Sequence, residues 1–141
     1  MKIWVKVLIV LVIVALGVGV FFYFYPPKFL YIIRTEHIVD GYFSVYAQID
    51  DAVDEYLAGR KGKLNRLLDE LEKYGKQLSH IHPPPGAKLD FVLLNKAHAL
   101  TLQYALSRVV RQGDLDLYYM LKTKADNAWD DWREERERIK K

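Results

Sequence analysis

The sequence opens with a long run of uncharged, mostly apolar residues. From Val7 to Tyr25 no charged side chain interrupts the segment VLIVLVIVALGVGVFFYFY. As a helix rising 1.5 Å per residue, the segment would span about 28 Å, close to the thickness of the hydrocarbon core of a bilayer. A helix this apolar on every side is hard to place in the core of a small soluble domain. The run therefore predicts a short cytoplasmic tip and a transmembrane anchor over residues 1–26, followed by a separate domain over 27–141.

The residues at the two ends of the run resemble membrane-interface anchors. Lysine and tryptophan precede it and five aromatic residues close it, which is the aromatic-belt pattern of membrane spans. We expect these side chains to lie at headgroup level. They are Lys2, Trp4 and Lys6 on the first side and Phe21, Phe22, Tyr23, Phe24 and Tyr25 on the second.

A cleaved signal peptide is the alternative for this segment. Ala15-Leu16-Gly17 has the small-x-small pattern of a cleavage site, but the apolar run continues for eight residues beyond Gly17. Apolar regions of signal peptides are usually shorter, so an uncleaved anchor is the favoured interpretation.

The basic residues predict the orientation of the anchor. Lys2, Lys6 and the amino group precede the span, whereas Lys28 and the more distant Arg34 follow it. By the positive-inside rule, the N-terminus is expected in the cytoplasm. In a bacterial cell this would place the protein in the inner membrane, with the domain in the periplasm or outside the cell.

Charge and cysteine content exclude several classes of function. Without the two lysines of the anchor segment, the 21 basic residues become 19, against 18 acidic ones. A nearly neutral domain lacks the basic face that a nucleic-acid partner requires. The chain has no cysteine, so disulfides, thiolate metal sites, a cysteine nucleophile and attachment through a lipidated cysteine are all excluded.

The domain has the periodicity of helices and no strand signal. Apolar residues recur at three- and four-residue steps, for example at Tyr42, Tyr46, Ile49 and Val53. The pattern predicts an all-α fold, in which the N-terminal transmembrane helix is followed by an antiparallel bundle of about four helices. The expected helices span about 27–58, 63–81, 88–112 and 114–139.

Two of these expected helices have unusual surfaces. The third is apolar on nearly every side, so it is expected to be central or to face a partner. Gly113 is expected to cap the end of the third helix. The fourth helix is expected to begin after it, with Asp114 as its N-cap. It ends in WREERERIKK, which looks too charged to be buried.

The segment SHIHPPPGA, residues 79–87, invites a metal-site hypothesis. Two histidines two residues apart share a face on a strand, but here they end a helix, where such residues point about 200° apart. A structural turn is the stronger interpretation, because proline forces His82 out of helical geometry. The predicted turn comprises His82, Pro83, Pro84, Pro85 and Gly86.

No catalytic constellation is recognisable, and no cofactor or metal is predicted. Glu-x-x-His motifs, which di-iron helical bundles require, are missing, and His98 has Asn95 three residues before it. The acidic segment 49–55 is best explained as a solvated helix face rather than as a calcium loop. The chain is therefore not expected to be an enzyme.

Aromatic residues of the last helix are candidates for partner binding. Tyrosine and tryptophan are over-represented at protein interfaces, and the simpler explanation for the same residues is core packing with the polar tip at the rim. The candidates are Tyr118, Tyr119, Trp129 and Trp132.

The assembled layout resembles small, membrane-tethered, extracytoplasmic helical-bundle proteins of bacteria. The resemblance is carried by the N-terminal anchor, the proline turn, KAHALTLQYAL, the RQGDLD break and ADNAWDDW. It is a resemblance of architecture and implies no particular activity. The chain departs from the lipoprotein variety of this layout, because it has no cysteine.

These features predict a non-catalytic, single-pass membrane protein that acts as an accessory, scaffold or interaction subunit. Its expected partners are membrane lipid, through the N-terminal helix, and other membrane or envelope proteins or a second copy of the chain. The alternative is a membrane-tethered carrier or sensor that holds an apolar ligand in the bundle core, with His37 or His98 as a ligand or hydrogen-bond donor.

Overall fold

A computed structural model describes residues 2–24, 27–110 and 114–141, excluding the side chains of Phe22 and Phe24. This part of the chain is helical and contains no strand, so the predicted all-α class is confirmed. The helices are α1 (Ile3–Phe24), α2 (Lys28–Tyr46), α3 (Ile49–Leu57), α4 (Gly62–Ser79), α5 (Lys88–Val110) and α6 (Leu115–Lys140).

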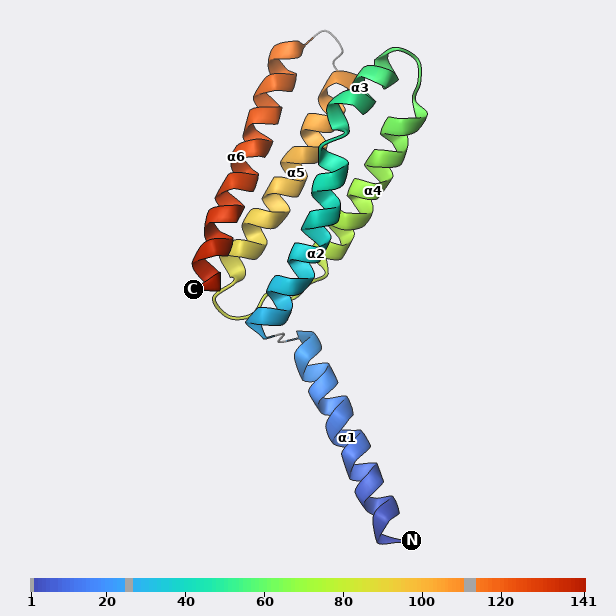
Figure 1. The fold of residues 1–141 in the computed structure, drawn as a ribbon, viewed down its shortest axis with the longest axis vertical. Coiled ribbons are helices and arrows are strands. Elements are labelled where there is room, and N and C mark those ends of the chain that lie inside the picture. Colours follow the sequence, from blue (N-terminus) through green and yellow to red (C-terminus); the bar gives the residue numbers. More distant parts are fainter. Residues whose placement is uncertain (1, 25–26, 111–113) are drawn as a thin grey trace.

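Helix α1 stands apart from the remaining helices (Figure 1). Its segment Ile3–Phe21 is long and apolar enough to cross a membrane, and none of it is buried against the rest of the protein. Helices α2, α4, α5 and α6 lie side by side, with α3 at the end farthest from α1. We call this far end distal, and the end next to α1 proximal.

The predicted helix over 27–58 is two helices, so five helices rather than four follow α1 in the described part of the chain. The break lies at Ala47 and Gln48, where the Gln48 N–H donates to the Val45 carbonyl at 3.0 Å in a tighter turn. The Gln48 side-chain amide also donates to the Ser44 carbonyl at 3.0 Å, which gives this carbonyl a partner at the break. The bend allows Ile49 and Val53 to become fully buried.

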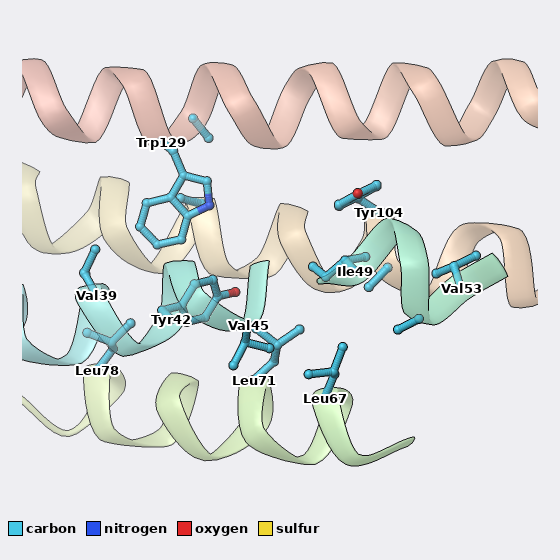
Figure 2. Packing of buried hydrophobic residues seen from close by; sticks show 14 of the residues in the cluster. Val39, Tyr42, Val45, Ile49, Val53, Leu67, Leu71, Leu78, Tyr104 and Trp129 are labelled. Atoms are coloured by element: carbon cyan, nitrogen blue, oxygen red, sulfur yellow. The ribbon is translucent and has the colours of Figure 1, made fainter. Parts of the chain in front are cut away.

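The core is filled by apolar side chains from every helix of the domain (Figure 2). Aromatic rings connect α2 to α5 and α6. The ring centroids of Tyr42 and Trp129 are 5.1 Å apart, those of Phe43 and Trp129 4.8 Å, and those of Tyr46 and Tyr104 6.0 Å. Large rings therefore occupy the space between α2 and the tightly packed pair α5 and α6.

The buried face of α6 corrects an expectation from the sequence, and α5 packs against α3, α4 and α6. On α5 the buried stripe consists mostly of small or polar residues, whereas Leu89, Val92 and Val110 are exposed. On α6 the charged C-terminal segment is not wholly solvated, because Glu135, Arg136 and Ile139 are buried. These three residues continue the stripe of Trp129 and Trp132, Glu135 and Arg136 one helical turn further on and Ile139 two turns.

Candidate functional site

The first polar cluster of the interior surrounds the Asp90 carboxylate, in the first turn of α5. Asp90 is fully buried and accepts hydrogen bonds from the Tyr31 hydroxyl at 2.7 Å and the Trp132 indole at 3.3 Å. Arg136 donates to both carboxylate oxygens, from Nε at 2.9 Å and from Nη2 at 3.0 Å. Burial and the neighbouring carboxylate raise the pKa of the Tyr31 hydroxyl, which therefore stays protonated and keeps donating.

The Arg136 guanidinium also has several interaction partners inside the protein. It is 2% exposed and donates from Nη2 to the Thr35 hydroxyl at 2.6 Å. Its Nη1 lies 3.6 Å from the Glu36 carboxylate, and its Cζ lies 4.8 Å from the Trp132 ring centroid. The cluster thus joins α2, α5 and α6 at the proximal end, and both charges have their partners inside the protein.

A second cluster lies midway along the domain, around His98 of α5. Its Nδ1 shares a hydrogen bond of 2.8 Å with the Tyr42 hydroxyl of α2. The ring fits against Gly75 of α4, where a Cβ would meet His98 Cε1 at 2.6 Å. Burial lowers the pKa of His98. Beside this pair, the Trp129 indole donates to the Thr101 hydroxyl at 3.0 Å.

The third cluster surrounds Asp50 of α3 at the distal end. Its carboxylate accepts hydrogen bonds from Tyr104 at 2.5 Å, from Lys122 at 2.7 Å and from Tyr118. Partial burial works against ionisation, but these three donors outweigh it and lower the pKa of Asp50. The cluster ties α3 to α5 and α6.

The three clusters are arranged for holding helices together. In each of them the acidic or basic group is paired with side chains from other helices. A cavity of about 310 Å³ lies beside the first cluster, and Arg136 and Glu36 are among the residues that line it. Among the residues that the structure describes, no group of three or more histidine, aspartate or glutamate side chains is positioned to hold a metal ion.

The predicted partner-binding residues divide between core and surface. Tyr118, Trp129 and Trp132 are buried, at 3%, 1% and 4% exposure, and Tyr119 is 58% exposed. These three buried residues pack in the core, and their polar atoms form hydrogen bonds inside the protein. Tyr119 is the member of the set that a partner can reach in this conformation.

The histidine and proline segment forms a tight turn at the proximal end. His80 Nδ1 lies 2.6 Å from the Lys76 carbonyl at the end of α4. The Ala87 N–H donates to the Pro84 carbonyl at 3.0 Å, and Gly86 has a φ of +88°. Proline followed by a glycine at positive φ is the sequence that a type II turn requires. The His82 ring lies 5.6 Å from that of Tyr23 in α1.

The predicted interface anchors lie at the two ends of α1. Trp4 and Tyr23 are exposed, at 63% and 59%, and Phe21 at 57%. Lys2 and Lys6 are also exposed. Tyr25 and the side chains of Phe22 and Phe24 lie outside the described part of the chain.

An apolar groove between α5 and α6 opens at the distal end. Among the residues that the structure describes, no charged side chain lines it, and several neighbouring apolar side chains are exposed to solvent. We call it the distal groove, and its lining residues are Gln103, Leu106, Ser107, Val110, Leu117 and Leu121. Exposed apolar side chains at the same end of the domain are Leu115, Tyr119 and Met120.

Reasoning from the sequence missed Asp90 and Arg136, although a signal for both was present. Asp90 lies in register with Leu94, Ala97 and Thr101, which are all buried on one face of α5. An ionisable residue placed on the buried stripe of a helix needs a partner of opposite charge. Extending the stripe of Trp129 and Trp132 by one turn would have identified Arg136.

The comparisons with known proteins add no assignment. No protein-family model, no curated protein and no solved structure matches this chain.

Proposed function

We propose that this chain is a non-catalytic, single-pass membrane protein that serves as an accessory or scaffold subunit of a membrane or envelope complex. In this proposal α1 is the anchor, the N-terminus is cytoplasmic, and residues 27–141 form an extracytoplasmic antiparallel bundle. Helices α2 and α3 together occupy one of the four helix positions of this bundle. The apolar, unburied helix α1 supports the anchor.

The observation that carries the binding role is the distal groove. Leu106 and Val110 are 38% and 74% exposed, although they end a helix whose other face packs tightly in the core. Exposed apolar surface concentrated at one place on a small domain marks an interaction site. Because the described residues that line the groove are uncharged, the partner we propose is an uncharged, apolar segment of another membrane or envelope protein.

The position of the groove fits a tethered protein. Helix α5 has 23 residues, so it extends about 34 Å from the proximal to the distal end. An anchored domain of this length would present the groove well above the lipid headgroups. Tethering also confines the domain to the membrane, which raises its effective concentration for partners held there.

The saturated polar clusters support the non-catalytic part of the proposal. Asp90, His98 and Asp50 each have their polar partners inside the protein. A general acid or base needs a proton-transfer partner in the substrate within hydrogen-bond reach. A substrate would have to displace an existing internal contact at each of these three residues.

The test is site-specific photo-crosslinking of the full-length chain in its native membrane. A photoreactive residue replaces Val110 in the groove, and in a matched control it replaces Glu72, which is exposed on α4. We expect a discrete cross-linked product, identified by mass spectrometry, from position 110 and none from position 72. The same partner should co-purify stoichiometrically with the wild type and be lost with Leu117→Asp.

The other possible outcomes would contradict the proposed partner. A cross-link only to a second copy of the chain would identify self-association. No cross-link and no co-purifying subunit would overturn the accessory role.

An apolar-ligand carrier is the second candidate, and the size of the distal groove favours it. Its volume of about 420 Å³ lies within the range of small-ligand pockets. His98, which the sequence offered as a ligand, already contacts Tyr42, so the groove is the better place for such a molecule. Native mass spectrometry of the purified protein would show a bound small molecule if the chain is a ligand carrier, and an additional subunit if it is an accessory protein.

A further inference from the structure

The proximal end of the domain is held close to the membrane by the length of the chain. Helix α1 ends at Phe24 and α2 begins at Lys28, so the connection spans at most about 14 Å. If α1 crosses the bilayer, as proposed above, the first turns of α2 must lie at or just above the headgroups. The inference below rests on that anchor.

Apolar side chains at this end of the domain point outward. Phe29 and Ile33 are 62% and 60% exposed, one turn apart on α2, because Tyr31 and Thr35 occupy its inner face. Leu89, the second residue of α5 after the proline turn, is 53% exposed. Exposing these three apolar side chains to water costs free energy, and placing them at the boundary of headgroups and acyl chains is favourable.

Two segments at this end of the domain contain basic residues and no acidic ones. Segments 27–35 and 80–89 contain Lys28, Arg34 and Lys88 and not one aspartate or glutamate. All three basic side chains are exposed, and none has an ion-pair partner among the described residues. We call Lys28, Phe29, Ile33, Arg34, Lys88 and Leu89 the proximal surface.

Several acidic side chains at this end are paired within the protein, whereas the exposed Glu134 of α6 lines the same hollow as Leu89. Glu36 lies 2.7 Å from Lys140 and 3.6 Å from Arg136, and Glu135 is paired with Arg138. Lys28, Arg34 and Lys88 form no ion pair with these acidic side chains. Their positive charge is complementary to a phosphate-bearing membrane surface.

The turn of 80–87 connects this surface to the end of α1. The His82 ring packs edge-on against that of Tyr23, at a centroid separation of 5.6 Å. Figure 1 shows the α4–α5 connection and the start of α2 at the same end of the domain, next to α1. Two segments far apart in sequence therefore reach the level at which α1 would leave the bilayer.

We propose that the proximal surface is a second membrane contact, in which Phe29, Ile33 and Leu89 enter the headgroup boundary while Lys28, Arg34 and Lys88 bind anionic lipid headgroups. This contact orients the domain upright on its anchor, because a single helix and a short connection would otherwise let it tilt. The domain thus binds a lipid surface in addition to being tethered to it.

The absence of cysteine makes a direct test simple, since each probe site can carry the one cysteine of the chain. Full-length Ile33→Cys and Leu89→Cys variants are labelled with a small fluorophore and reconstituted into vesicles that contain nitroxide-labelled lipid as quencher. Val12→Cys reports insertion of α1, and Arg66→Cys, exposed on α4, reports a site away from the membrane. The vesicles consist of phosphatidylcholine alone or mixed with phosphatidylglycerol.

We expect quenching at positions 33 and 89, stronger in the anionic vesicles, and none at position 66. The triple variant Lys28→Gln, Arg34→Gln, Lys88→Gln should lose this anionic enhancement. Each basic residue near an anionic surface shifts the docked-to-undocked ratio about fivefold. A matched triple variant at the distal turn, Arg60→Gln, Lys61→Gln, Lys63→Gln, should retain the enhancement, because it removes equal charge far from the bilayer.

Two results separate the failure of this contact from the failure of the anchor. Quenching at position 12 without quenching at 33 and 89 would overturn the second contact and leave the anchor standing. A lack of quenching at position 12 would overturn the anchor and the inference that rests on it. Equal quenching at 33 and 89 in both vesicle types would overturn the role of the basic residues.

Discussion

Arg136 of α6 holds the Asp90 carboxylate of α5 by both oxygens, with Nε at 2.9 Å from Oδ2 and Nη2 at 3.0 Å from Oδ1. Neither side chain has more than a few per cent of its surface in water. A two-pronged contact of this kind fixes position as well as charge, because the planar guanidinium accepts one orientation of the carboxylate. It sets the register of α6 against α5 at the end of the domain next to α1.

Removing one member of this pair should destabilise the domain strongly. In Arg136→Met the Asp90 carboxylate stays buried and loses its compensating charge, which is expected to cost about 3–5 kcal/mol in the free energy of unfolding. Chemical denaturation of the full-length protein in mild detergent, followed by tryptophan fluorescence, measures the loss, since Trp129 and Trp132 are buried.

Two further variants show whether the unpaired charge causes the loss. Arg133→Met removes the neighbouring exposed arginine, which pairs with Asp130 on the same helix, and should cost no more than about 1 kcal/mol. The double variant Asp90→Leu, Arg136→Met should lose less stability than the sum of its single changes. If Arg136→Met were as mild as Arg133→Met, the buried pair would not have the role described.

The sequence was sufficient to predict the helical class because the periodicity is a property of each helix alone. The break at Ala47 and Gln48 was not predictable in the same way. Neither residue is a proline or glycine, and the bend is fixed by where Ile49 and Val53 find space in the core. Tertiary packing decides such a position, and local preference does not.

The polar clusters were hidden from sequence reasoning because each joins residues far apart in the chain. Asp90 and Arg136 are 46 positions apart, and Tyr42 and His98 are 56 apart. Periodicity places a residue on a face but does not say which partner lies across from it. The distal groove was visible only as an excess of apolar residues on the third expected helix, and its location required the packing of α5 on α6.

Two glycines of α4 should respond in opposite directions to substitution by alanine. In Gly75→Ala the new Cβ would lie 2.6 Å from His98 Cε1 and 2.7 Å from Cδ2, so the ring must move away from position 75, which disturbs its hydrogen bond with Tyr42. We expect a loss of about 1–3 kcal/mol. Gly62, at the start of the same helix, has nothing within 4 Å, so Gly62→Ala should gain up to about 1 kcal/mol. Thermal unfolding of both variants tests the pair, and equal effects would contradict the contact.

The stability of the domain should fall as the pH drops below 6.5, because of His98. Burial holds the pKa of His98 below its ordinary value of 6.5, so in this range the unfolded chain binds a proton that the folded chain does not. Stability is therefore intact above pH 6.5 and decreases as the pH falls towards the folded-state pKa. The unfolding free energy, measured by denaturant titration at several pH values in this range, should depend less on pH in His98→Gln than in the wild type. His37→Gln, at an exposed position of α2, should keep the wild-type profile.

Asp50 should contribute a second, more acidic loss of stability. Partial burial opposes its ionisation, but hydrogen bonds from Lys122, Tyr104 and Tyr118 outweigh this and hold the pKa of Asp50 below 3.8. A depressed folded-state pKa stabilises the fold above the unfolded-state value, and this contribution is lost as the pH falls below 3.8 towards the folded-state pKa.

Replacing the carboxylate tests this assignment at neutral pH. Asp50→Asn should lower the unfolding free energy by about 1–2 kcal/mol at pH 7, a modest amount because water reaches almost half of the Asp50 side chain, which is 45% exposed. The variant should also weaken the pH dependence of the unfolding free energy below pH 3.8.

Asp51→Asn is the matched control, because Asp51 is exposed on the same turn and its replacement removes the same charge without touching Tyr104 or Lys122. It should leave the unfolding free energy at pH 7 and its pH dependence close to wild type. If the two variants behaved alike, the general acidity of α3, and not the bonded carboxylate of Asp50, would account for the effect.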